Sequence, residues 1–211
     1  MTLHAPPRPF PDFNTALLAK GSEIVRIHSP EFSGGAGNPC KGGPTRFGPL
    51  TDIKGDCIPT LYGASTLEAA AFESVFHDVA PSPNPTAVVL SKVLSRTVTK
   101  LALKRPAKLA LLHSPDLARL GLERSDLIDT YPTAYAQTAR WAEAFYEADD
   151  KLDGLVWTSR RCDPALAFVF FESRLPADSW QAMDRHEVNT SPDILGQIRL
   201  AAQRANILLT L

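Results

Sequence analysis

The chain has 211 residues, of which 44% are hydrophobic and 21% are charged, and its formal net charge at pH 7 is -1. A chain of this length can bury its own core without disulfides or metals, and its near-zero charge excludes a general attraction to nucleic acid or anionic membranes. No apolar run reaches the roughly 18 residues of a membrane-spanning helix, and the first residues lack the features of a secretory signal. We therefore expect a cytoplasmic protein with one decorated domain.

The three cysteines, Cys40, Cys57 and Cys162, are widely spaced and form no CxxC pair. This spacing indicates neither a zinc ribbon nor a disulfide framework. We expect reduced thiols, which fit a reducing cytosol, and no metal site.

The chain opens with an irregular, proline-rich arm over residues 1–21, within which residues 13–20 are expected to form a short helix. Residues 23–28 then alternate between polar and apolar, which predicts a strand. Arg26 and His28 share one face of this strand, and we expect Val25 and Ile27, on the other face, to form the core face.

A long irregular loop, rich in glycine and proline, is expected over residues 29–56. Loops of this length in compact domains often line a functional site. A short strand follows at residues 58–62. Ser65 with Glu68 three residues later matches a capping box, so a helix is predicted over residues 66–78.

The rest of the chain mixes strands and helices without strict alternation. Strands are expected at residues 87–93, 97–103, 155–157 and 166–171, and helices over 131–147 and from residues 114 and 191 onward. This order favours an α+β fold with a mixed sheet over a doubly wound fold.

The last helix opens at Ser191 and Pro192, a favourable N-cap followed by proline at the first helical position. An apolar stripe at helical spacing either packs on the domain or forms a contact in a homodimer. Its residues are Ile194, Leu195, Ile198 and Ala201.

Glu73 lies at the flank of the apolar stripe of the helix at 66–78, which partly buries its carboxylate. Burial of a carboxylate is costly unless the group is paired or used. The alternative is a flank glutamate that reaches water. His77 lies one turn further on the same side, where an ion pair with Glu73 is within reach.

Four other polar residues are candidates for the same site. Arg26 and Arg46 lie beside the glycine-rich loop, and paired arginines suit a diphosphate because guanidinium groups match phosphate oxygens. Tyr62 ends a strand, where its ring can stack on a planar group. Ser159 ends a buried strand, a common place for ligand-binding groups. Taken singly, each also fits an ordinary structural role.

Five short segments, in this order, resemble the RES-domain family, which is named for its arginine, glutamate and serine. The segments are Arg26-Ile27-His28, Arg46-Phe47, Leu61-Tyr62-Gly63-Ala64-Ser65, Ala70-Ala71-Phe72-Glu73 and Trp157-Thr158-Ser159. The resemblance covers residues 22–172, which we expect to be the RES domain. Residues 1–21 would precede it as an arm, and residues 173–211 would follow as an extension with a helix packed on the same domain.

The resemblance implies a fold similar to that of ADP-ribosyltransferases of the diphtheria-toxin type. Carried over residue by residue, it implies that Glu73, Arg46 and Tyr62 are catalytic. Arg26, Arg46, Tyr62 and Ser159 would bind NAD+, which RES proteins consume as a substrate, without a metal. The loop between Arg46 and Tyr62 is somewhat longer than in compact members, which affects the contacts expected from that loop.

The resemblance also implies a toxin of a toxin–antitoxin pair that cleaves the nicotinamide–ribose bond of NAD+, as a phosphorylase or a glycohydrolase. The acceptor would be inorganic phosphate, water or a protein side chain, and the sequence does not decide among them. The expected partner is an Xre-type antitoxin, with no direct binding to nucleic acid or membranes. A protein mono-ADP-ribosyltransferase and a non-enzymatic binding module on the RES scaffold are the alternatives.

Overall fold

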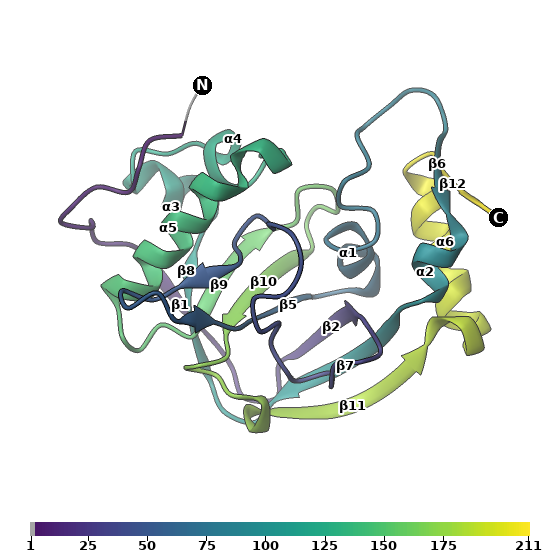
Figure 1. Cartoon of the computed structure of the whole chain (residues 1–211), viewed down its shortest axis with the longest axis horizontal. Helices are drawn as coiled ribbons and strands as arrows, with labels where there is room; N and C mark the ends of the chain where they lie inside the picture. Colours follow the sequence, from purple (N-terminus) through teal and green to yellow (C-terminus); the bar gives the residue numbers. More distant parts are fainter. Residues whose placement is uncertain (1–2) are drawn as a thin grey trace.

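The computed structural model describes residues 3–211, which are built around a curled, mixed sheet of eight strands (Figure 1). In sheet order the strands are β1 (Thr15–Leu18), β8 (Ala107–Leu111), β9 (Gly154–Thr158), β10 (Leu166–Phe171), β5 (Thr60–Ala64), β2 (Glu23–His28), β7 (Thr97–Leu103) and β11 (Trp180–Glu187). Strands β8 and β9 are parallel, and the other neighbours in this sheet are antiparallel. The predicted α+β class with a mixed sheet is confirmed.

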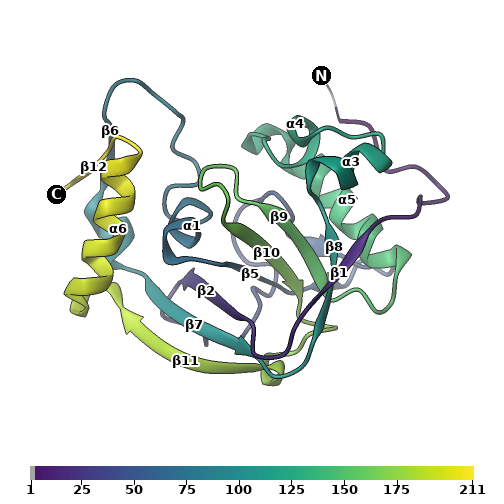
Figure 2. The same cartoon turned by 180° about the vertical axis from the view of Figure 1, so that it is seen from behind.

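Two groups of helices pack on this sheet, one near β8 and β9 and the other near β2 and β7 (Figures 1 and 2). The first group is α3 (Ser114–Arg119), α4 (Arg124–Leu127) and α5 (Tyr135–Ala148), and the second is α1 (Leu67–Phe72), α2 (Leu90–Leu94) and α6 (Pro192–Arg204). Short 3-10 helices are η1 (Pro132–Ala134), η2 (Ala177–Ser179) and η3 (Val188–Thr190). No helix among residues 3–211 is long and apolar enough to cross a membrane.

Two small sheets complete the fold. Strands β6 (Thr86–Val89) and β12 (Ile207–Thr210) pair in parallel beside α6. Strands β3 (Leu50–Thr51) and β4 (Cys57–Ile58) pair in antiparallel fashion inside the glycine-rich loop. The loop is therefore irregular for most of its length, as predicted, but has a short hairpin near its end.

Buried side chains form separate clusters under the two helical groups. The cluster under α5 includes Phe47, Trp141, Phe145, Trp157 and Phe171, and the cluster around α1 and α6 includes Phe72, Phe76, Val98, Ile198 and Ile207. A third cluster contains Ile24, Leu61, Leu101, Phe170 and Trp180. Because Arg46 precedes Phe47 of the first cluster and Glu73 follows Phe72 of the second, the expected site lies where these two clusters meet.

The helix expected at residues 13–20 is wrong. Residues 15–18 form edge strand β1, which pairs with residues 107–110 of β8. Local sequence does not indicate this pairing, because β1 is mostly exposed and lacks the alternation of a half-buried strand. Backbone pairing with the distant strand β8 determines the extended conformation of residues 15–18.

Several predicted bounds also change. The strand expected at 87–93 ends at Val89 and gives way to helix α2, and the helix expected from residue 131 begins as η1. Strands β8, β11 and β12 were not predicted. Strand β11 was missed because its exposed edge carries a run of polar residues. The strands at 23–28, 97–103 and 166–171 are confirmed at the predicted bounds.

Helix α1 is shorter than predicted and has a different cap. Thr66, not Ser65, is the N-cap, and its hydroxyl accepts the Ala69 N–H at 3.1 Å. The Ser65 hydroxyl instead accepts the N–H of Leu166 at 2.9 Å, which ties it to the neighbouring strand. The helix ends at Phe72, so Glu73 is its C-cap rather than a mid-helix residue.

Both faces of strand β2 are covered. Arg26 and His28 are 6% and 5% exposed, whereas Val25 and Ile27 on the opposite face are half-buried against the cluster around α1. The expectation that the apolar face alone is the core face is therefore wrong. The polar face lies against the glycine-rich loop, which covers it.

The C-terminal helix α6 begins as predicted, with Ser191 at the N-cap and Pro192 in the first turn. Ile198 and Ala201 of its apolar stripe are buried, and the stripe packs against the cluster around α1. The stripe thus contacts the core of its own chain.

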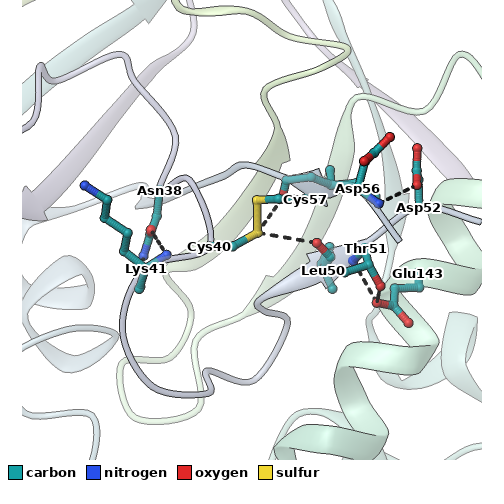
Figure 3. Close-up of a disulfide and its surroundings, with 10 residues drawn as sticks. Asn38, Cys40, Lys41, Leu50, Thr51, Asp52, Asp56, Cys57 and Glu143 are labelled. Carbon is teal, nitrogen blue, oxygen red and sulfur yellow. Dashed lines mark hydrogen bonds between the residues drawn. A yellow bond between two sulfur atoms is a disulfide. The ribbon is translucent and has the colours of Figure 1, made fainter. Parts of the chain in front are cut away.

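Cys40 and Cys57 form a disulfide with Cα atoms 6.1 Å apart, and the expectation of reduced thiols is wrong for this pair (Figure 3). Backbone hydrogen bonds between Asn38 and Thr60, at 2.7 and 3.2 Å, bring the two ends of the loop together. Spacing in the sequence does not indicate this closure. Cys162 is free, as expected, and it is buried.

Reduction of the disulfide should lower the free energy of unfolding by about 3 kcal/mol, because a cross-link across a loop of this length restricts the unfolded chain. Chemical denaturation with and without a dithiol reductant measures this difference. The double variant C40S/C57S should match the reduced protein and be insensitive to reductant. Titration of three free thiols in the unreduced, unfolded protein would contradict the pairing.

Candidate active site

The topology of the sheet brings the ends of two strands to one place. Strands β5 and β9 flank β10 and run antiparallel to it, so both end at the same edge of the sheet. Ser65 N–H donates to Leu166 O and Ser159 N–H donates to Ala165 O, each at 2.8 Å. Helix α1 starts just after β5, and its end places Glu73 beside Ser159.

The Glu73 carboxylate is held by three donors. Its Oε2 accepts from Arg46 Nη1 at 3.1 Å, and its Oε1 accepts from Ser159 Oγ at 2.8 Å and from Arg160 N at 3.2 Å. The side chains of Glu73 and Arg46 are 10% and 4% exposed. Of the two alternatives for Glu73, the paired and buried carboxylate is confirmed, and the flank glutamate that reaches water is wrong.

Arg46 is positioned through its own backbone and its neighbours. Its carbonyl accepts the hydroxyl of Thr138 on α5, and Phe47 beside it is fully buried. A tight turn between Thr45 and Gly48, with a backbone hydrogen bond of 2.7 Å, directs the side chain toward Glu73. Within residues 3–211, the buried Arg46 Nε has no hydrogen-bond partner.

Tyr62 on β5 supports this turn. Its hydroxyl accepts the N–H of Phe47 at 2.9 Å and bonds Thr45 Oγ1 at 3.1 Å. Burial raises the pKa of Tyr62 to about 12, so the phenol stays protonated at neutral pH. The ring lies edge-on to Trp157, with centroids 6.5 Å apart. Tyr62 therefore acts on the Arg46–Glu73 pair indirectly, because it holds the turn that carries Arg46.

Arg26 lies apart from this group. Its Nη1 donates to Gly34 O at 2.8 Å and to Ala36 O, at the start of the glycine-rich loop. Burial lowers the pKa of Arg26 to about 10. Among the residues that the structure describes, it makes no hydrogen bond or ion pair with the other four expected site residues. Hydrogen bonds thus link Arg46, Glu73 and Ser159 directly and connect Tyr62 to them through the N–H of Phe47, whereas Arg26 bonds carbonyls at the start of the loop.

The two histidines near these elements have other partners. His28 donates from Nδ1 to Ser29 O and accepts at Nε2 from Thr99 Oγ1, both at 2.8 Å. Burial and, to a smaller extent, the Arg26 charge lower the pKa of His28 to about 4. His77 bonds Asp78 at 2.8 Å and the Tyr135 hydroxyl at 2.7 Å. It does not form the ion pair with Glu73 that its spacing allowed.

Two residues that hold the site were missed from the sequence. Arg160 contributes a backbone N–H to Glu73, and a backbone group leaves no mark on residue type. Thr138 is a fully buried threonine on the apolar side of α5. Its polar side chain on a face of apolar residues was the available signal.

Comparison with models of protein families assigns the chain to one family. The model of the RES domain matches residues 23–188, which is most of the chain. The chain belongs to the RES-domain family. The matched range runs from β2 to η3 and includes all five expected site residues. The division into residues 1–21, 22–172 and 173–211 stays a prediction.

Among solved structures, the RES fold of this chain resembles the M. tuberculosis MbcT–MbcA toxin–antitoxin complex. A chain of that complex aligns with a TM-score of 0.60 and 15% sequence identity, over 87% of this chain and 92% of its own length. No curated protein matches the sequence. This likeness shows a shared fold.

The variant Arg46→Met should lower the free energy of unfolding by about 3 to 5 kcal/mol, because it leaves the Glu73 carboxylate buried without its partner charge. The double variant Arg46→Met/Glu73→Gln leaves neither charge buried and should recover part of the loss. Urea denaturation of the wild type, both single variants and the double variant measures the coupling. Equal losses in the single and double variants would contradict a coupled pair.

Stability should fall as the pH drops through the window between 6.5 and about 4 set by the pKa of His28. In that window the unfolded state binds a proton that folded His28 does not, so the penalty grows toward low pH and reaches about 3 kcal/mol. Denaturation at several pH values measures this slope. His28→Gln, which does not titrate, should flatten it, whereas an unchanged slope would assign the proton to another group.

Proposed function

We propose that this RES protein cleaves the nicotinamide–ribose bond of NAD+ and acts as the toxin of a toxin–antitoxin pair. The observation that carries the proposal is the buried Glu73 carboxylate, held by Arg46, Ser159 and the Arg160 N–H at the meeting point of two cores. Membership of the RES family, whose members consume NAD+, supports the choice of substrate.

The chemistry fits a fixed carboxylate. Cleavage of an N-glycosidic bond passes through a transition state in which the ribose carries positive charge, as in glycoside hydrolysis. A carboxylate already held in place stabilises that charge without reorganisation. The three donors on Glu73 fill three of its about four acceptor positions, which leaves one on Oε2 for a ribose hydroxyl.

Each of the other expected site residues has its own role, and these roles differ in how directly the residue acts on Glu73. Arg46 is the charge partner of Glu73 and holds its Oε2 through Nη1. Ser159 fixes the rotamer of Glu73, and Tyr62 holds the loop that carries Arg46. Arg26, expected to bind NAD+ directly, instead organises the start of that loop, because its guanidinium already serves two loop carbonyls.

The proposed partner is an antitoxin. The similar solved structure is that of a toxin–antitoxin complex, and RES proteins are commonly paired with an antitoxin of the Xre type. The proposed substrate is a cytoplasmic metabolite, so we place the protein in the cytoplasm. Disulfides are rare there, and the contacts of the loop with Tyr62 and Thr138, which hold Arg46, do not involve Cys40 or Cys57.

Purified protein incubated with adenine-labelled NAD+, with and without inorganic phosphate, should consume NAD+. Glu73→Gln should slow this at least about 100-fold, because it removes the charge that stabilises the transition state. Glu68→Gln on the same helix is the matched control and should leave turnover unchanged. The labelled product identifies the acceptor: ADP-ribose for water, its 1″-phosphate for phosphate, and labelled protein for a side chain.

The proposal fails if NAD+ stays intact with phosphate present and Glu73→Ala is as toxic in cells as the parent. Absence of NAD+ binding by calorimetry would then favour a non-enzymatic module on the RES scaffold. Label found on a macromolecule alone would favour a protein mono-ADP-ribosyltransferase.

A further inference from the structure

Two consecutive arginines, Arg160 and Arg161, follow Ser159 in the turn between β9 and β10. Arg160 Nη1 donates to Thr130 O at 2.8 Å, and Arg161 Nη1 donates to Phe76 O at 3.1 Å. Neither guanidinium forms an ion pair within residues 3–211. Each carries five N–H donors, so most of its hydrogen-bonding capacity remains free for a ligand.

Both arginines line a hollow of about 50 Å³ together with His77, Asp78, Tyr131 and Tyr135. A single water occupies roughly 10 to 15 Å³ on this measure, so the hollow takes a few waters or one group the size of a phosphate. It is too small for a nucleoside. The guanidinium of Arg160 also lies over the Tyr131 ring, 4.7 Å from its centroid.

The charges around the hollow favour an anion. Burial and, secondarily, the charge of Arg160 lower the pKa of Arg161, which shows that two cations lie close together in a partly desolvated place. The carboxylate on the wall, Asp78, is bonded to His77 Nδ1 at 2.8 Å. With Glu73 balanced by Arg46, the two guanidinium charges of Arg160 and Arg161 against the carboxylate of Asp78 leave a positive balance, and guanidinium groups match the oxygens of a phosphate.

The hollow adjoins the Glu73 site. The Arg160 N–H donates to Glu73 Oε1 at 3.2 Å, so the same residue contacts the carboxylate and lines the hollow. His77 bonds the Tyr135 hydroxyl at 2.7 Å, and the charges of Arg46 and Glu73 contribute to the pKa of both. A phosphate in this hollow would therefore sit next to the carboxylate proposed to hold the ribose.

We propose that this hollow is a phosphate-binding subsite beside Glu73, with Arg160 and Arg161 as its ligands. The inference rests on the proposed function for the origin of the phosphate, which is either the diphosphate of the dinucleotide or free inorganic phosphate. The recognition chemistry is the same for both sources.

The test is calorimetric titration of the full chain with inorganic phosphate alone and with ADP-ribose alone. Binding of at least one of these should weaken tenfold or more in Arg161→Ala. Arg199→Ala, which removes an exposed arginine from α6, is the matched control and should bind like the wild type. Arg161→Lys keeps the charge, should retain part of the affinity, and replaces the alanine variant if that variant does not fold.

The two probes distinguish the sources. Binding of phosphate that ADP-ribose does not displace supports a site for the free anion, and binding of ADP-ribose alone supports the dinucleotide diphosphate. Equal affinity of wild type and Arg161→Ala for both probes, or no binding of either, overturns the subsite. Phosphate binding in a protein that leaves NAD+ intact keeps the subsite and overturns the proposed function instead.

Discussion

The buried ion pair between Arg46 and Glu73 is the interaction on which the rest of the site depends. Two charges removed from water are stable only if each has its partner and further hydrogen bonds. Ser159 and the Arg160 N–H supply the additional donors to Glu73. The pair and its donors thus link the glycine-rich loop, the end of α1 and the turn after β9. These three segments are distant in the sequence, and no local sequence pattern predicts their contact.

Arg46 sits on a loop that is irregular but not loosely held. Tyr62 accepts the N–H and Thr138 donates to the carbonyl of the peptide group that joins Arg46 to Phe47, and Phe47 anchors the turn in the core. Further along, Thr51 donates its N–H to Glu143 of α5 at 2.8 Å (Figure 3). The disulfide closes a loop that these contacts already position, so its main physical effect is on the unfolded chain.

Helix α5 connects the site to the N-terminal arm. Its inner face provides Thr138 to the Arg46 backbone, while Trp141 Nε1 donates to the carbonyl of His4 at 2.9 Å. Phe10 of the arm packs edge-on against Phe145, with ring centroids 5.0 Å apart. The arm therefore belongs to the support of the site, although it carries no residue expected to contact substrate.

By itself, the sequence determined the strands at 23–28, 97–103 and 166–171 and the α+β class, because periodicity is local in the chain. The grouping of Arg46, Tyr62, Glu73 and Ser159 came from the resemblance of their ordered motifs to the RES-domain family. Only the tertiary structure decided that residues 15–18 form edge strand β1 and that Cys40 bonds Cys57. It also decided that Arg26 bonds the glycine-rich loop and that the backbone N–H of Arg160 bonds Glu73. Each of these depends on pairing between distant segments or on a backbone N–H, and neither leaves a trace in residue type or spacing.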